Sequence, residues 1–149
     1  FLIGNGIDGH VAPMCGTKLV FPGAKLDGES LTNLMNDEKV TISLGVPTIW
    51  LLLLNYLRES GKKIDTVKRL IIGGSSCPRT LFEGFEDEFG AEVIHAWGMT
   101  EMSPLGTVNM PSLGEEPKDR TEYYDQKLPQ GRTIFGHQQL WDSSSTRLF

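Results

Sequence analysis

Two short stretches of this sequence combine glycine, hydroxyl, aromatic and acidic residues in an order that could serve a nucleotide and a metal ion. They are GGSSCP at residues 73–78 and HAWGMTEMSP at residues 95–104. In the second, Trp97 offers a flat face for stacking on a base, and the Thr100 hydroxyl could donate to a phosphate oxygen. Glu101 adds an oxygen ligand of the kind that Mg²⁺ prefers. A core tryptophan beside a solvated Thr-Glu pair is the alternative interpretation of this stretch.

The first stretch offers backbone rather than side chains to a ligand. Gly73 and Gly74 allow close approach of the backbone, and the following residues precede a predicted helix, whose N-terminus favours anions. A tight turn with a serine as the N-cap explains the same residues without a ligand. A Walker-type phosphate loop is excluded, because the pattern GxxxxGK followed by Ser or Thr does not occur. Cys77 is interpreted as a small packing residue rather than a nucleophile, and His95 as a strand-end hydrogen-bonding residue rather than a base.

Strands and helices alternate along the first two thirds of the chain and would position both stretches. Apolar β-branched runs predict strands, and apolar residues at helical spacing predict helices. The predicted strands are Lys18–Phe21, Val40–Leu44, Lys68–Ile72 and Glu92–Trp97, and the predicted helices are Asp27–Glu38, Thr48–Ser60 and Arg79–Phe89. The short connections indicate an α/β fold with a mostly parallel sheet and helices on both faces. Because ligands bind outside the carboxyl ends of parallel strands, both stretches fall where a site is expected.

The composition limits the classes of function. The chain has 149 residues, enough for one domain, and a net charge of −5 without a run of Lys or Arg. A nucleic-acid partner held by a basic surface is therefore not expected. The apolar run at residues 49–54 is far shorter than the ~20 residues of a transmembrane helix. Cys15 and Cys77 lack metal-ligand spacing and are expected as free thiols, so we expect a soluble, cytoplasmic protein.

The two ends of the chain are its least regular parts. The sequence begins at Phe1 without an initiator Met and stops at Phe149 without a terminating element, which we interpret as an internal piece of a longer protein. Residues 110–149 are rich in Pro, Gly and charge, and are expected to form a loop-rich tail with one or two short elements.

The two motifs, taken together and in this order, resemble the adenylate-forming (AMP-binding) superfamily of acyl-CoA synthetases, aryl-CoA ligases and luciferases. Within it, the chain is most similar to the medium- and long-chain fatty-acyl-CoA synthetase branch, which includes methylmercaptopropionate–CoA ligase-like members. GTKLVFPGAKLDGESL at residues 16–31 and TISLGVPTIWLLLLNYL at residues 41–57 are similar to that branch as well. The resemblance is strong over residues 13–109 and weaker over QGRTIFG at residues 130–136. It identifies the chain as part of the large N-terminal domain of such a fold.

The resemblance implies a role for each matching residue. Trp97 would stack on the adenine of ATP, and the segment from Gly74 would form the opposite wall. Thr100 and Glu101 are implied to be catalytic, through contact with a phosphate and through binding of Mg²⁺. Val46 and Pro47 are implied to bind the acid substrate. The residues implied to bind the nucleotide are Gly74, Ser75, Ser76, Cys77, Pro78, His95, Ala96, Trp97, Gly98, Met99 and Thr100.

The reaction that the resemblance implies has two steps, uses ATP and Mg²⁺, and takes coenzyme A as co-substrate. A carboxylic acid, in this branch a fatty acid, is first joined to AMP with release of pyrophosphate. The thiol of coenzyme A then displaces AMP to give a thioester, without a covalent enzyme nucleophile. The resemblance places the loop that grips the triphosphate before Phe1, and the ribose-binding Asp and catalytic Lys after Phe149. It also allows a homodimer of the full-length parent.

Other interpretations remain for the chain taken alone. Without the triphosphate loop and the lysine, we expect the isolated chain to be inactive in ligation. A non-catalytic adenine-nucleotide-binding remnant or interaction module is the alternative, and adenylation for peptide synthesis is a third class. The first ten residues, FLIGNGIDGH, depart from the branch at Leu2 and Gly6, which leaves the entrance for the acyl chain undefined.

Overall fold

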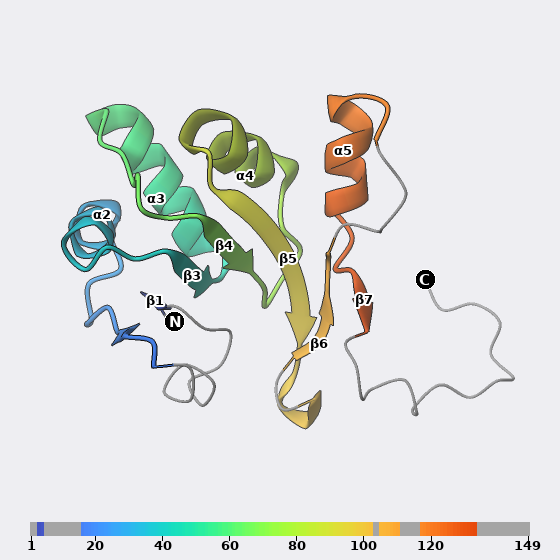
Figure 1. Cartoon of the computed structure of the whole chain (residues 1–149), viewed down its shortest axis with the longest axis horizontal. Helices are drawn as coiled ribbons and strands as arrows, with labels where there is room; N and C mark the ends of the chain where they lie inside the picture. Colours follow the sequence, from blue (N-terminus) through green and yellow to red (C-terminus); the bar gives the residue numbers. More distant parts are fainter. Residues whose placement is uncertain (1–2, 5–15, 103–104, 111–116, 134–149) are drawn as a thin grey trace, which may run out of the picture.

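The computed structural model describes residues 3–4, 16–102, 105–110 and 117–133, drawn in colour in Figure 1. The strands are β1 (Ile3–Gly4), β2 (Leu19–Val20), β3 (Ile42–Gly45), β4 (Arg69–Ile72), β5 (Glu92–Gly98), β6 (Leu105–Val108) and β7 (Arg132–Thr133). The helices are α2 (Gly28–Asp37), α3 (Pro47–Ser60), α4 (Arg79–Glu83) and α5 (Arg120–Lys127), with a π-helical turn η1 (Gly84–Glu88) and a 3-10 turn η2 (Thr100–Met102). The described strands form one sheet in the order β2-β1-β3-β4-β5-β6-β7.

The centre of the sheet is parallel. β3 pairs with β4 through Ser43 and Leu70, and β4 pairs with β5 through Leu70 and Val93. The β1–β2, β1–β3, β5–β6 and β6–β7 pairs are antiparallel. Because α3 and α4 connect the parallel strands, the predicted α/β fold with parallel strands and crossover helices is confirmed.

The ends of α2 and α3 coincide with local capping and helix-ending residues. The carboxylate of Asp27 accepts a hydrogen bond from the Ser30 backbone N–H at 2.9 Å, which starts α2 and lowers the pKa of Asp27. α3 starts with Pro47 and ends at Gly61, whose φ of +69° lies in the left-handed region that favours glycine. Local sequence therefore determines where both helices begin and end.

Two elements differ from the expectation. The predicted helix Arg79–Phe89 is α-helical only as far as Glu83 and continues as the π-helical turn η1. At the start of this turn, a Cβ on Gly84 would come within 2.6 Å of Leu54 Cδ2, so α3 packs very closely here. β6 is not predicted from the sequence, because the four residues LGTV at 105–108 give too short a pattern.

The described helices pack against one face of the sheet. Leu70 and Ile72 of β4 and Val93 of β5 belong to a buried cluster with side chains of α2, α3, α4, η1 and α5, which follow one another along the sheet in Figure 1. Ile71 and Ile94 alternate with them and point to the opposite face. Helices were expected on both faces; within the described ranges they cover one, and the other carries a cleft. None of the described helices is both long and apolar enough to cross a membrane.

Candidate functional site

A cleft with a volume of about 640 Å³ opens where the parallel strands end. Leu44, Ile71 and Ile94 line it from the sheet face opposite the helices. Further lining comes from the loop after β4, from the end of β5 with the start of η2, and from β6. The cleft therefore lies at the carboxyl ends of β3, β4 and β5, the position at which α/β sheets bind ligands.

Gly73 and Gly74 line the cleft, and we call residues 73–78, which they begin, the glycine wall. Gly74 has a φ of +87°, a backbone conformation that side-chain-bearing residues rarely adopt. A Cβ on Gly74 would lie 3.2 Å from Cγ1 of Val46, and a Cβ on Gly73 would lie 3.1 Å from the Ala96 carbonyl oxygen. The absence of side chains at Gly73 and Gly74 thus allows this segment to lie close to the start of α3 and to β5. The same close approach puts Val46 beside the predicted nucleotide-binding residues.

Residues 96–100 also line the cleft, and we call them together with Glu101 the Trp97 wall. Trp97 pairs with Thr107 across the β5–β6 ladder, and the register shifts between Trp97 and Gly98 before the chain turns into η2. Trp97 is 36% exposed and Met99 is 43% exposed, so both present large apolar surfaces at the cleft. This exposure contradicts the alternative interpretation of Trp97 as a core residue.

The cleft brings together half of the residues predicted for binding and catalysis. Those that line it are Val46, Gly74, Ala96, Trp97, Gly98, Met99 and Thr100. The others lie around it: Ser75, Ser76 and Pro78 are exposed in the glycine wall, Pro47 is buried at the first position of α3, and Glu101 is exposed in η2. Two motifs separated along the chain therefore meet at one cavity.

The buried side chains of Cys77 and His95 serve the protein's own packing. Cys77 belongs to the apolar core, and burial raises the pKa of its thiol to about 12, as suits the predicted packing residue. His95 is 2% exposed; its Nδ1 donates to the Leu128 carbonyl oxygen at 2.7 Å, and its Nε2 lies 3.4 Å from the Ser75 carbonyl oxygen. Ala96, on the cleft side of β5, is better placed than His95 to meet a ligand.

Among the residues that the structure describes, Glu101 is the predicted magnesium ligand next to the cleft. Within residues 3–4, 16–102, 105–110 and 117–133, no group of three or more His, Cys, Asp or Glu side chains could hold a metal. The exposed carboxylate of Glu101 follows Thr100 at the cleft. Mg²⁺ is commonly held by one or two carboxylates together with substrate phosphates, so this arrangement fits that ion.

The apolar lining of the cleft is the part of the site that sequence reasoning missed. Leu26, Leu44, Ile49, Ile71, Ile94, Leu105, Val108 and Met110 all contribute to it. No charged side chain occurs among the described lining residues. The signal that could have identified part of this set is the alternation within the parallel strands, because residues next to buried core positions must face the other side of the sheet.

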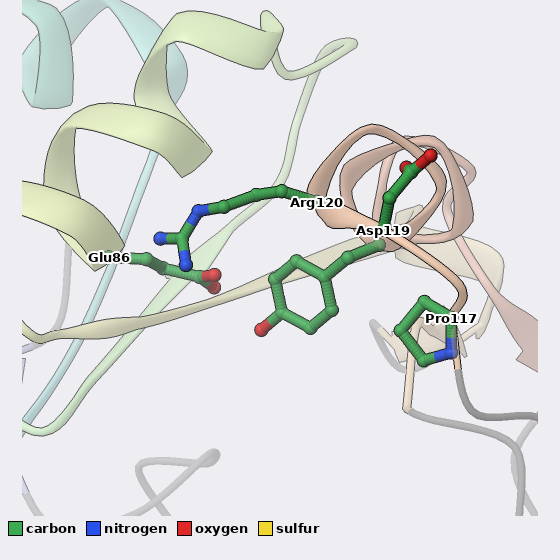
Figure 2. Close-up of a pocket in the computed structure, with 5 residues that line it drawn as sticks. Glu86, Pro117, Asp119 and Arg120 are labelled. Carbon is green, nitrogen blue, oxygen red and sulfur yellow. The ribbon is translucent and has the colours of Figure 1, made fainter.

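A second hollow, of about 510 Å³, lies between η1 and the start of α5 (Figure 2). Glu86 of η1 and Arg120 of α5 extend into it from the two elements, with Asp119 and Pro117 at the edge. The charged groups here pair with one another: Arg120 with Asp87, and Lys127 with Glu86. We call the facing surfaces of η1 and α5 the η1–α5 junction and interpret them as a structural contact.

Comparisons with known proteins identify relatives of this chain. A family model described as "AMP-binding enzyme" matches residues 6–139. The chain is 42% identical over 123 residues to a 3-methylmercaptopropionyl-CoA ligase of Ruegeria lacuscaerulensis, covering 83% of this chain and 23% of that protein. It is 45% identical over 127 residues to a medium-chain-fatty-acid–CoA ligase of Ectopseudomonas oleovorans, covering 85% of this chain and 23% of that protein.

The fold is similar to that of a solved ligase structure. The crystal structure of the anthranilate CoA ligase AuaEII in complex with anthranoyl-AMP matches with a TM-score of 0.63 at 20% identity. The match covers 78% of this chain and 20% of that one. The chain thus spans less than a quarter of the length of each of these relatives.

Proposed function

Because the chain belongs to the AMP-binding enzyme family, we propose that it forms the nucleotide-side part of an ATP-dependent ligase that joins a carboxylic acid to coenzyme A. One observation carries the proposal. The glycine wall and the Trp97 wall, which come from separate motifs, line the same cleft at the carboxyl ends of the parallel strands. A flat adenine ring placed between backbone on one side and an indole on the other would be held by both.

The chemistry asked of these residues is mainly positioning of anionic reactants. Trp97 would fix the adenine, and the Thr100 hydroxyl would donate to a phosphate oxygen near the reacting carboxylate. The Glu101 carboxylate would hold Mg²⁺, which offsets the negative charge of the phosphates when bound. The acid attacks the α-phosphorus with departure of pyrophosphate, and the thiol of coenzyme A then displaces AMP, so neither step needs Cys77 as a nucleophile.

The lining of the cleft favours an aliphatic acid. Ile49, Met99 and Met110 are apolar, the two methionines are flexible, and no described lining residue offers a charge that could pair with an amino group. Two relatives are named for medium-chain fatty acids and for 3-methylmercaptopropionate. We therefore propose a linear acid of short to medium length as the substrate, rather than an amino acid for peptide synthesis.

The test is product formation by the full-length protein that contains this chain. It is incubated with ATP, Mg²⁺, coenzyme A and a series of linear acids, with amino acids as the comparison series. The expected result is one AMP, one pyrophosphate and one acyl thioester for each acid consumed, with linear acids preferred. ATP cleavage without thioester, or a preference for amino acids, would contradict the proposal.

A further inference from the structure

The last residues of α5 and the segment that follows are bound to the hairpin of β5 and β6 through consecutive backbone carbonyl groups. Five consecutive carbonyl oxygens, those of residues 126–130, each lie within 3.0 Å of a side-chain donor of this hairpin, and three of them share the two amide protons of Asn109. We call this segment the carbonyl run. The donors are His95 on β5, and Thr107 and Asn109 at the end of β6.

Asn109 makes the largest contribution. Its Nδ2 lies 2.8 Å from the carbonyl oxygen of Gln126, 3.0 Å from that of Lys127 and 2.7 Å from that of Pro129. Because all three neighbours are acceptors, the side-chain atom that faces them must be the donating nitrogen. The last carbonyls of a helix lack partners within the helix, so Asn109 provides donors that the end of α5 requires.

The other two donors extend the contact on either side. His95 Nδ1 donates to the Leu128 carbonyl oxygen at 2.7 Å, and Thr107 Oγ1 donates to the Gln130 carbonyl oxygen at 2.7 Å. Just beyond the run, Gly131 lies so close to β6 that a Cβ on it would come within 2.1 Å of the Val108 carbonyl carbon. The backbone of the run is therefore pressed directly against the hairpin.

The hairpin residues that bind the run are the immediate neighbours of the Trp97 wall. Thr107 is paired with Trp97 in the β5–β6 ladder, and the Asn109 N–H donates to the His95 carbonyl oxygen at 2.8 Å. Trp97 follows His95 by two residues on β5 and lines the cleft, just before the register with β6 shifts between Trp97 and Gly98. Fixing the run thus fixes the strand positions on both sides of the indole.

A second connection joins α5 to the start of β5. Glu86 Oε1 accepts a hydrogen bond from the Val93 backbone N–H at 2.8 Å and also pairs with Lys127. The C-terminal end of α5 is consequently attached to β5 near the start of the strand through Glu86, and Leu128, just after α5, is attached at the middle of the strand through His95.

We propose that His95, Thr107 and Asn109 are positioning residues, which use the carbonyl run to hold the Trp97 wall at the spacing from the glycine wall that the nucleotide requires. The inference rests on the proposed function for its ligand. The residues themselves need not touch the nucleotide. Losing the contact would let the end of β5 shift, so that only a fraction of molecules presents a competent cleft, and the apparent affinity for ATP would fall by that fraction.

The test compares Asn109→Ala and the nearly isosteric Asn109→Asp in the full-length protein. Asn36→Ala is the matched control, because Asn36 Nδ2 also donates to a backbone carbonyl, that of Lys63 at 2.9 Å, away from the hairpin. Asn109→Ala should raise KM for ATP about three- to tenfold with a smaller change in kcat, since one net hydrogen bond is worth roughly that factor. Asn109→Asp should raise it further, because a carboxylate would face three carbonyl oxygens.

Hydrogen exchange of residues 96–102 gives a second measurement that does not depend on catalysis. It should be faster in both Asn109 variants than in the parent and unchanged in Asn36→Ala. Thr107→Val removes one hydroxyl at similar volume and should also raise KM for ATP and speed the exchange of residues 96–102. It replaces Asn109→Asp in the comparison if that variant does not fold. Parent-like KM and exchange in Asn109→Ala and Thr107→Val, with loss of thermal stability alone, would overturn the inference. Absence of thioester formation by the parent would instead refute the proposed function. The exchange measurement would then decide alone whether the carbonyl run positions residues 96–102.

Discussion

The cleft and the η1–α5 junction differ in whether their polar side chains are exposed or paired. At the cleft, the described lining is apolar and carries no charged side chain, and the Glu101 carboxylate beside it is exposed. At the junction, Lys127 and Glu86 pair with only 9% of each side chain exposed, and the Tyr124 hydroxyl donates to Asp87 at 2.6 Å. The cleft therefore keeps its few polar groups accessible to a ligand, whereas the junction uses them to join two helices.

This difference gives each region its own experimental signature. Substitution of a polar group at the cleft should reduce activity and leave the free energy of unfolding nearly unchanged. Substitution of a paired charge at the junction should lower the free energy of unfolding first, with activity falling only as folded protein is lost.

The largest effect is expected for Glu101→Gln in the full-length protein. Removal of one charge-stabilising group from a reaction centre typically costs about 10²–10³-fold in rate, so adenylation should fall by that factor. The melting temperature should stay within about 1 °C of the parent, because an exposed carboxylate contributes little to packing. The control is Glu59→Gln, the same substitution at an exposed position of α3, which should change neither the adenylation rate nor the melting temperature. Adenylation at the parent rate by Glu101→Gln would show that Glu101 does not bind the magnesium ion.

A large loss of stability is expected for Lys127→Met at the junction. The substitution leaves the Glu86 carboxylate without its cation, and breaking a buried pair costs about 3 kcal/mol. The double variant Lys127→Met/Glu86→Gln removes the charge that was left behind, and chemical denaturation should show that it recovers a large part of the loss. A Lys127→Met variant as stable as the parent would mean that the junction does not depend on this pair.

The same pair predicts a dependence of stability on alkaline pH. Burial alone would lower the pKa of Lys127, but its hydrogen bonds to Glu86 and Tyr123 and the charge of Glu86 outweigh burial, so its pKa is raised. The stabilisation is therefore complete below the unfolded-state pKa of about 10.4 and is lost as the pH rises through the higher folded-state value. Unfolding measured from pH 9 to pH 11 should show this loss in the parent and less of it in Lys127→Met.

Gly74→Ala tests whether one residue of the cleft contributes both to stability and to ATP binding. The φ of +87° and the close approach to Val46 Cγ1 should together destabilise the protein by about 1–2 kcal/mol and raise KM for ATP. Gly90→Ala is matched in backbone conformation, with a φ of +67°, but its Cβ would meet nothing within 4 Å. It should therefore lose stability without any effect on KM. Equal kinetic behaviour of the two variants would show that the glycine wall is not part of the site.

The smallest effect is expected for Arg58→Ala, which removes an exposed ion pair. Arg58 and Glu88 have side chains that are 45% and 43% exposed, so the loss should be at most about 0.5 kcal/mol in thermal or chemical unfolding. The hydrogen bond from Arg58 lowers the pKa of Glu88, so this small contribution is present above the unfolded-state pKa of about 4.3 and disappears as the pH falls below it. A loss comparable to that of Lys127→Met would show that exposure does not separate strong pairs from weak ones here.

The elements with local signals could be predicted from the sequence. Asp27 as an N-cap, Pro47 at a first helical position and Gly61 at a helix end each act through their own backbone, so α2 and α3 needed no tertiary information. The likeness of the two motifs to the adenylate-forming family placed both at one cleft, and the structure brings seven of the named residues to it. Cys15, Ser103, Pro104 and residues 134–136 lie outside the described ranges.

The remaining features depend on contacts between distant segments. The π-helical turn η1 begins where Gly84 meets Leu54 of another helix, and no local pattern reports that approach. The donors to the carbonyl run come from residues 17–33 positions away in the sequence, which periodicity does not detect. The backbone around His95 stays a predicted contact of the nucleotide, while its side chain lies against the carbonyl oxygens of Leu128 and Ser75, a role visible only once β5, α5 and the glycine wall are assembled.

The central claim is that adenine binds between the glycine wall and the Trp97 wall, and Trp97→Ala in the full-length protein tests it most directly. Base–aromatic stacking is worth about 1–3 kcal/mol, so KM for ATP should rise about tenfold or more while KM for the acid and the melting temperature stay close to the parent. Trp97→Phe, which keeps an aromatic face, should retain most of the affinity. An unchanged KM for ATP in Trp97→Ala would contradict the account and place the nucleotide elsewhere.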